Sequence, residues 1–108
     1  MTNGINTREM ILEILLQINE EGEHSHIAIR NALSKYQFLP KQDRAFITRV
    51  CEGTLEYRIQ IDYIINSFSK VTVDKMKPAI REILRSAVYQ LKYMDSVPDL
   101  SLIHISEP

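Results

Sequence analysis

The stretch QDRAFITRVCEGTLEYRIQIDYII, residues 42–65, decides the fold class of this chain. Its apolar side chains recur at spacings of three and four residues, which predicts helix over nearly the whole stretch. Gly53 stands in the middle of this pattern, although a glycine inside a helix costs about 1 kcal/mol relative to alanine. We expect Gly53 either to end one helix before another begins or to let a second helix approach its backbone closely. The positions on the stripe are Phe46, Ile47, Val50, Cys51 and Thr54, followed by Ile61, Ile64, Ile65 and Phe68.

The helical period continues on both sides of this stretch. Thr7 and Ser25 are expected to cap two earlier helices, and Gly22 ends the first of them. Pro40 and Pro78 suit the first turns of the third and fifth helices. No segment alternates with a period of two for long enough to form a sheet, so we predict an all-α bundle of five amphipathic helices. The apolar stripe of the last helix consists of Ile80, Ile83, Leu84, Ala87, Val88 and Leu91.

Length, composition and charge are those of one globular domain. The chain has 108 residues, of which 44% are apolar and 25% are charged, which is enough to bury a core. Its single cysteine excludes an intrachain disulfide, and it has neither a signal pattern nor a long apolar run. We therefore expect a cytoplasmic protein with no membrane partner. The net charge is −1, but residues 40–92 carry ten basic and six acidic side chains, and only this segment would attract phosphate.

The basic residues of this segment are open to two interpretations. Arg49 lies three residues before Glu52, a spacing at which helical side chains can form a surface ion pair. Arg58 lies four residues before Asp62 and has the same possibility. Arg44 has no helical partner of this kind. Either these side chains cover a solvated face or they hold phosphates.

The last helix carries a row of three cations opposite its apolar stripe, Lys77, Arg81 and Arg85. Their spacing of four residues places like charges side by side, which is mildly unfavourable. A solvated face is the ordinary explanation for such a row, whereas a ridge that follows a phosphate backbone would account for the repulsion. The candidate RNA-binding residues are therefore Arg44, Arg49, Arg58, Lys77, Arg81 and Arg85.

No constellation of catalytic or metal-binding residues is visible. Cys51 lies on the apolar face without a histidine at helical distance, so we interpret it as a small core side chain. His24 and His26 form a pair that no further ligand completes as a zinc site. Tyr57 and Tyr63 could stack on bases, although a tyrosine more commonly buries its ring and leaves its hydroxyl in contact with water. We predict no catalytic, cofactor-binding or metal-binding residue in this chain.

The order of these pieces resembles the NusB-like domain that begins a bacterial small-subunit rRNA 5-cytosine methyltransferase. The resemblance implies a helical fold of two three-helix bundles, association with rRNA, and a separate catalytic domain that holds S-adenosylmethionine and the catalytic cysteines. None of that second domain is in this chain, and Cys51 matches neither catalytic position. The family's basic set matches Arg44, Arg58 and Arg85, and the charge pattern adds the other three candidates. The stretches that carry the resemblance are TREMILEILLQI, DRAFITRVCEGTLEYRIQIDYII and KMKPAIREILRSAVYQLKYMDSVPD.

Two functions from different classes follow from this resemblance. The first is an RNA-binding accessory domain that positions rRNA for the absent methyltransferase domain. The second is a NusB-type transcription antitermination factor, which shares the fold and also acts through a ribosomal or transcription protein. The antitermination factors typically have an arginine-rich first helix, whereas Arg8 alone stands at that place here. We therefore favour the accessory domain.

The end of the chain departs from the family. After Asp99 the family continues into another amphipathic helix, whereas this chain reads LSLIHISEP. That ending resembles a translated sequencing-adapter junction or a divergent tail, so we assign residues 1–99 to a truncated NusB-like domain and 100–108 to the tail. A bundle without its last helices would expose an apolar patch and tend to self-associate.

Overall fold

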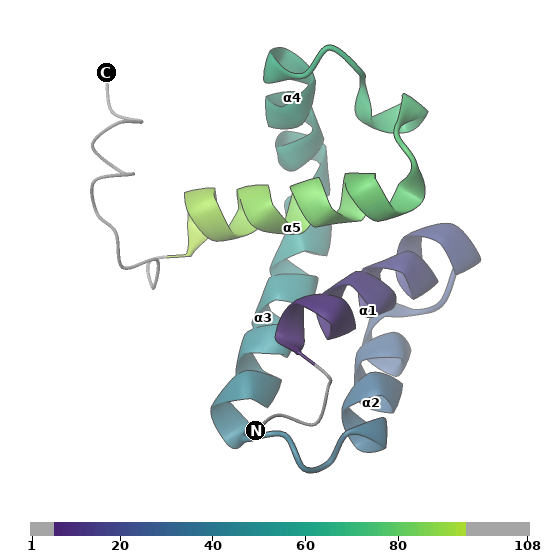
Figure 1. Cartoon of the computed structure of the whole chain (residues 1–108), viewed down its shortest axis with the longest axis vertical. Helices are drawn as coiled ribbons and strands as arrows, with labels where there is room; N and C mark the ends of the chain where they lie inside the picture. The colour runs from purple at the N-terminus through teal and green to yellow at the C-terminus, as the bar shows by residue number, and fades with distance from the viewer. Residues whose placement is uncertain (1–5, 95–108) are drawn as a thin grey trace.

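The computed structural model describes residues 6–94, which form five α-helices and one short 3₁₀ helix (Figure 1). This part of the chain contains no strand, so the predicted all-α class is confirmed. None of its helices is both long and apolar enough to cross a lipid bilayer. The expected domain boundary at residue 99 and the tail lie outside the described residues. The helices are α1 (Thr7–Glu21), α2 (Ser25–Lys35), α3 (Lys41–Glu56), α4 (Arg58–Phe68), η1 (Val73–Lys75) and α5 (Pro78–Tyr93).

The helix ends follow local chemistry, with small shifts from the expected positions. Asn6, one residue before the expected Thr7, caps α1 by accepting a hydrogen bond from the Glu9 backbone N–H at 2.8 Å. Gly22 ends α1 with φ of 80°, the left-handed conformation that glycine adopts at least cost. Pro78 is the first residue of α5, as predicted.

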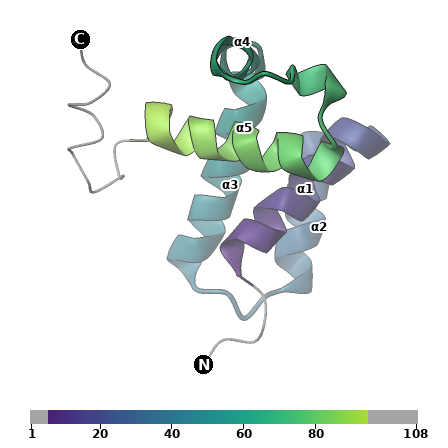
Figure 2. The same cartoon turned by 45° about the horizontal axis from the view of Figure 1, so that its top comes forward.

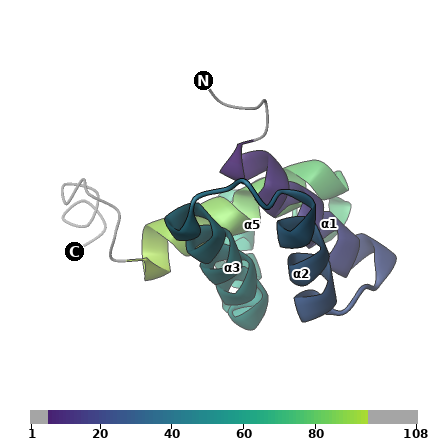
Figure 3. The ribbon, with the colours of Figure 1, turned by 90° about the horizontal axis from the view of Figure 1, so that it is seen from below.

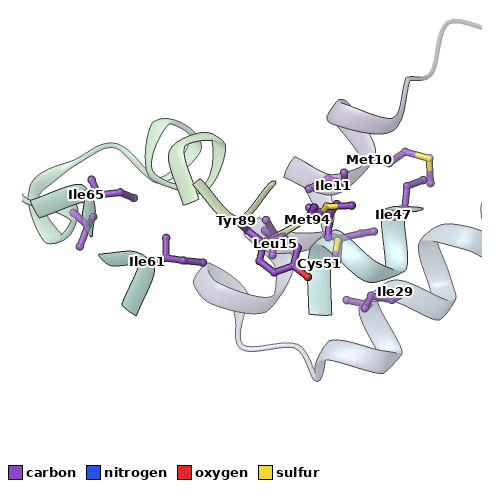
Figure 4. Close-up of a cluster of buried hydrophobic side chains, with 14 residues drawn as sticks. Met10, Ile11, Leu15, Ile29, Ile47, Cys51, Ile61, Ile65, Tyr89 and Met94 are labelled. Carbon is purple, nitrogen blue, oxygen red and sulfur yellow. The ribbon is translucent and has the colours of Figure 1, made fainter. Parts of the chain in front are cut away.

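The helices form a three-helix bundle with a two-helix extension. Helices α1, α2 and α3 pack together (Figure 3). Helix α4 continues beyond the end of α3 after a break at Tyr57 (Figure 1). Helix α5 crosses over the region where α3 meets α4 and also contacts α1 (Figures 1 and 2). The core runs through both parts (Figure 4) and includes Met10, Ile11, Ile14, Leu15, Ala28, Ile29, Ile47, Val50, Cys51, Ile61 and Ile65.

Gly53 marks the crossing of α3 and α5. Helix α3 continues past it to Glu56, so Gly53 does not end the helix. A Cβ atom built on Gly53 would overlap the ring of Tyr89, which α5 lays directly against the α3 backbone. The second of the two expected roles, close approach of another helix, is therefore confirmed.

Helix α5 buries two charged side chains and leaves much of its apolar stripe exposed. Its buried residues are Glu82, Arg85 and Tyr89. On the opposite face Ile83 is 51% exposed and Leu91 is 59% exposed, so the expected exposed apolar patch is confirmed within the described residues. The patch continues into a groove of about 760 Å³ between α1 and α5, whose apolar lining consists of Ile11, Leu12, Phe46, Ile83, Ala87, Leu91 and Met94.

Candidate nucleic-acid interface

Arg85, one of the six candidates, is buried in an ion-pair cluster. Its guanidinium donates hydrogen bonds of 2.8 Å to both carboxylate oxygens of Asp62 on α4 and to Glu82 on its own helix. Burial disfavours the charged guanidinium, but the hydrogen bonds and charges of these two carboxylates outweigh it and raise the pKa of Arg85. Five donors arranged in a planar fork suit this two-sided contact. Arg85 therefore holds α5 against α4.

Arg81 extends the same cluster toward α1. It pairs with Glu20 and lies 3.7 Å from Glu82. It also donates a hydrogen bond of 3.1 Å to the Val73 carbonyl, and only 15% of its side chain is exposed. The expected exposed ridge on α5 is wrong for Arg81 and Arg85, because long-range carboxylates draw both side chains inward. Of the row, only Lys77, at the start of α5, is exposed.

Arg58 also makes a long-range contact in place of the expected local one. Asp62, its expected partner, is occupied by Arg85. Arg58 donates instead to the Asn19 side-chain oxygen at 2.9 Å, and Asn19 donates to Glu82 at 3.0 Å. A continuous polar network thus connects the exposed Arg58 to a carboxylate with no exposed surface. We call this the junction network; its members are Asn19, Glu20, Arg58, Asp62, Arg81, Glu82 and Arg85.

Arg44 supports the end of α2. Its guanidinium donates to the Leu33 carbonyl at 3.0 Å and the Tyr36 carbonyl at 3.3 Å. The last carbonyls of a helix have no partner within the helix, so a long basic side chain can satisfy them. This contact ties α3 to α2 and leaves Arg44 half-buried.

Arg49 borders a cavity on the surface of α3. It is exposed and lines a shallow cavity of about 580 Å³ along α3, here called the α3 cavity. The expected Arg49–Glu52 pair does not form: within residues 6–94 no ion pair of 4.0 Å or less includes either side chain. The cavity is lined by Leu33, Lys41, Arg44, Ala45, Thr48, Arg49, Glu52, Gly53, Glu56 and Tyr89.

The structure therefore brings only two of the six candidates, Arg44 and Arg49, to one cavity. It adds Lys41 and Glu56, which the sequence argument did not consider, and Glu52, which it considered only as an ion-pair partner of Arg49. The spacing of four residues between Glu52 and Glu56 was visible in the sequence. Asn19 had no such signal, because its partner Glu82 lies 63 residues away.

The remaining candidates behave as ordinary fold residues. Burial raises the pKa of the Cys51 thiol to about 12, with a smaller contribution from Glu52, so this thiol is unreactive near neutral pH and is confirmed as a core side chain. Tyr57 stacks on Tyr93 at 4.4 Å between ring centroids, whereas Tyr63 is 76% exposed. No group of three potential metal ligands occurs in the part of the chain that the structure describes.

A sequence model described as the NusB family matches residues 5–106. The chain is 29% identical over 97 residues to a probable ribosomal RNA small subunit methyltransferase B of Bacillus subtilis, covering 90% of this chain and 21% of the relative. A Synechocystis protein of the same name is 32% identical over 94 residues, covering 87% of this chain and 21% of the relative. The chain thus spans about a fifth of the length of these methyltransferase relatives.

A second group of relatives, named transcription antitermination proteins, matches the chain at similar identity. A transcription antitermination protein NusB of Nocardioides is 29% identical over 93 residues, covering 85% of this chain and 67% of the relative. No solved structure matches the chain. The family match covers nearly the whole sequence, and both groups of relatives align over at least 84% of it. The chain belongs to the NusB family.

Proposed function

We propose that this chain is an RNA-binding accessory domain of a small-subunit rRNA cytosine-C5 methyltransferase. It holds rRNA while a catalytic domain, which this chain does not contain, transfers the methyl group. S-adenosylmethionine would be bound by that catalytic domain. This binding of rRNA takes place in the cytoplasm, where rRNA is assembled with protein.

One observation carries this proposal: Lys41, Arg44 and Arg49 line one cavity on the outer face of α3 in a NusB-family fold. Lys41 and Arg49 are exposed and have no carboxylate within 4.0 Å among residues 6–94. Cations that lack a protein partner are available to phosphate oxygens. Lys77 and Arg58 are also exposed but do not line this cavity, whereas Arg81 and Arg85 act through the shape of the junction.

The test measures how RNA affinity depends on salt. Fluorescence anisotropy with a single-stranded fragment of small-subunit rRNA should show binding that weakens steeply between 50 and 200 mM salt. Arg49→Gln and Lys41→Gln should each lower the affinity and reduce the salt slope by about one. Arg30→Gln, which removes another exposed guanidinium from α2, is the matched control. An RNA affinity that does not depend on salt concentration, or that falls equally in the Arg30→Gln control, would overturn the proposal.

The second candidate is an antitermination factor of the NusB type. Two observations favour it: the chain covers 67% of the Nocardioides NusB protein, and the exposed apolar face of α5 offers a surface to a ribosomal or transcription protein. The encoding DNA beyond Asp99 discriminates the two. A long open reading frame with a methyltransferase domain supports the accessory domain, and a stop after one or two further helices supports the antitermination factor.

A further inference from the structure

The α3 cavity is charged oppositely at its two ends. Lys41, Arg44 and Arg49 lie toward the start of α3, and Glu52 and Glu56 lie toward its end. At a rise of 1.5 Å per residue, Arg49 and Glu56 are separated by about 10 Å along the helix. A single nucleotide residue, from its phosphate to the edge of its base, spans such a distance. The cavity therefore presents cations and carboxylates together on the scale of one nucleotide.

This charge order is not one that the helix itself favours. The start of a helix carries a partial positive charge and its end a partial negative charge. Lys41 in the first turn and Glu56 in the last turn each oppose that dipole; Asp43 in the first turn complements it, and the last turn contains no basic residue. Neither side chain has an ion-pair partner within 4.0 Å among the described residues. A ligand with the complementary charge order would relieve both ends.

The floor of the cavity is well defined. Gly53 leaves room for the Tyr89 ring, and that ring is held in a stack with Tyr57 and Tyr93. The Thr48 hydroxyl donates to the Arg44 carbonyl at 3.0 Å, which directs it toward the helix backbone. The groups left to meet a ligand are thus the basic and acidic side chains at the rim.

We propose that the α3 cavity holds one unpaired nucleotide of the bound RNA and selects a base with an exocyclic amino group. Arg49 and Lys41 contact its phosphate, and Glu52 or Glu56 accepts a hydrogen bond from the amine. Ionised carboxylates only accept hydrogen bonds, so they suit the amino groups of cytosine, adenine or guanine, whereas the N3–H donor of uracil lies between two carbonyl oxygens that a carboxylate repels. This inference rests on the proposed RNA binding and adds a base preference to it.

The test compares hexacytidylate with hexauridylate on the full chain by fluorescence anisotropy at pH 7.5. The two oligonucleotides have equal charge and equal ring size, so phosphate contacts contribute the same salt slope to both. We expect hexacytidylate to bind about tenfold more tightly. Glu52→Gln or Glu56→Gln should remove most of that ratio, while Arg49→Gln should weaken both oligonucleotides and leave the ratio unchanged.

Glu21→Gln is the matched control, because it removes the same charge from an exposed position on α1. It should raise both affinities slightly and preserve the ratio, and circular dichroism melts check that all variants fold. Equal, salt-dependent binding of both oligonucleotides would overturn the inference while leaving RNA binding in place. A preference that survives in both glutamate variants would also overturn it. Binding of neither oligonucleotide nor the rRNA fragment would instead overturn the proposed function.

Discussion

The two faces of α5 show opposite relations between side-chain polarity and burial. The inner face carries Glu82, with no exposed surface, and Arg85, with 8%. The outer face carries Ile83 and Leu91, each more than half exposed. A buried charge is tolerated only when it is paired and hydrogen-bonded, and the junction network meets that condition. Ion pairs and the Gly53–Tyr89 contact therefore orient this helix, and of its apolar stripe only Leu84 and Val88 pack against the core.

Removing the central cation should produce the largest effect. Arg85→Met leaves Glu82 and Asp62 without their shared partner, and breaking a buried ion pair in this way costs about 3 kcal/mol. Urea denaturation should show that loss in the free energy of unfolding. Lys92→Met, an exposed change on the same helix, should stay within about 0.5 kcal/mol. A loss below 1 kcal/mol in Arg85→Met would mean that the ion pairs do not hold the inner face.

Filling the contact between α3 and α5 should be the next most harmful change. An alanine normally stabilises a helix relative to glycine, but the methyl of Gly53→Ala would overlap the Tyr89 ring. We expect a destabilisation of about 2 kcal/mol. In a Tyr89→Leu background the same substitution should be much less harmful, and the double-mutant cycle measures this coupling. A thermal melt in which Gly53→Ala raises the melting temperature of the otherwise unchanged chain would contradict the role of this contact.

Substitutions on the outer face of α5 should change self-association of the chain more than its free energy of unfolding. We expect the chain to self-associate through α5, because half-exposed Ile83 and Leu91 lie on one continuous apolar surface. Light scattering should show a mass above that of the monomer, and Ile83→Lys combined with Leu91→Lys should restore the monomer. Ile59→Lys, at an 83% exposed position on α4, should not. A stable monomer with a sharp melt in the unsubstituted chain would rule out this prediction.

The smallest expected effect is a pH dependence at Glu82. Burial raises the pKa of this carboxyl, and the opposing influence of Arg85, Asn19 and Arg81 does not fully compensate. A carboxyl with a raised pKa in the folded state binds its proton before the unfolded state does, so its titration adds stability as the pH falls toward 4.5. The stability of the unsubstituted chain relative to Glu82→Gln should therefore improve between pH 7 and pH 4.5. Urea denaturation at both pH values measures the change, and a relative loss on acidification would refute it.

Helix α3 shows how much of the fold the sequence could predict. Its stripe of Ile47, Val50 and Cys51 follows the helical period, and all three are buried. The same reasoning placed Gly22 at the end of α1 and Pro78 at the start of α5. Such features depend on neighbours within one or two turns, so local sequence contains the information that determines them.

The candidate site was less predictable, because residues distant in the sequence determine which of its arginines are buried. In the sequence, Arg49 and Arg85 were both cations on amphipathic helices and both were predicted to bind RNA. Arg85 is buried because Asp62, 23 residues away in the sequence, accepts hydrogen bonds from its guanidinium in the folded chain. Arg49 stayed open because no carboxylate comes within 4.0 Å of it among residues 6–94. Local spacing suggested Glu52 and Asp62 as partners for Arg49 and Arg58, and neither pair forms.

The spacing of residues along the chain was enough to predict the helical period, the all-α class, the buried Cys51 thiol and the apolar stripe on α5. Contacts between helices fix which face of α5 turns inward and which cations remain available to phosphate. The periodicity of a sequence shows which residues share one face of a helix, but not which neighbouring helix that face contacts. Burial of Glu82 and Arg85 depends on Asn19 and Asp62, which lie on other helices.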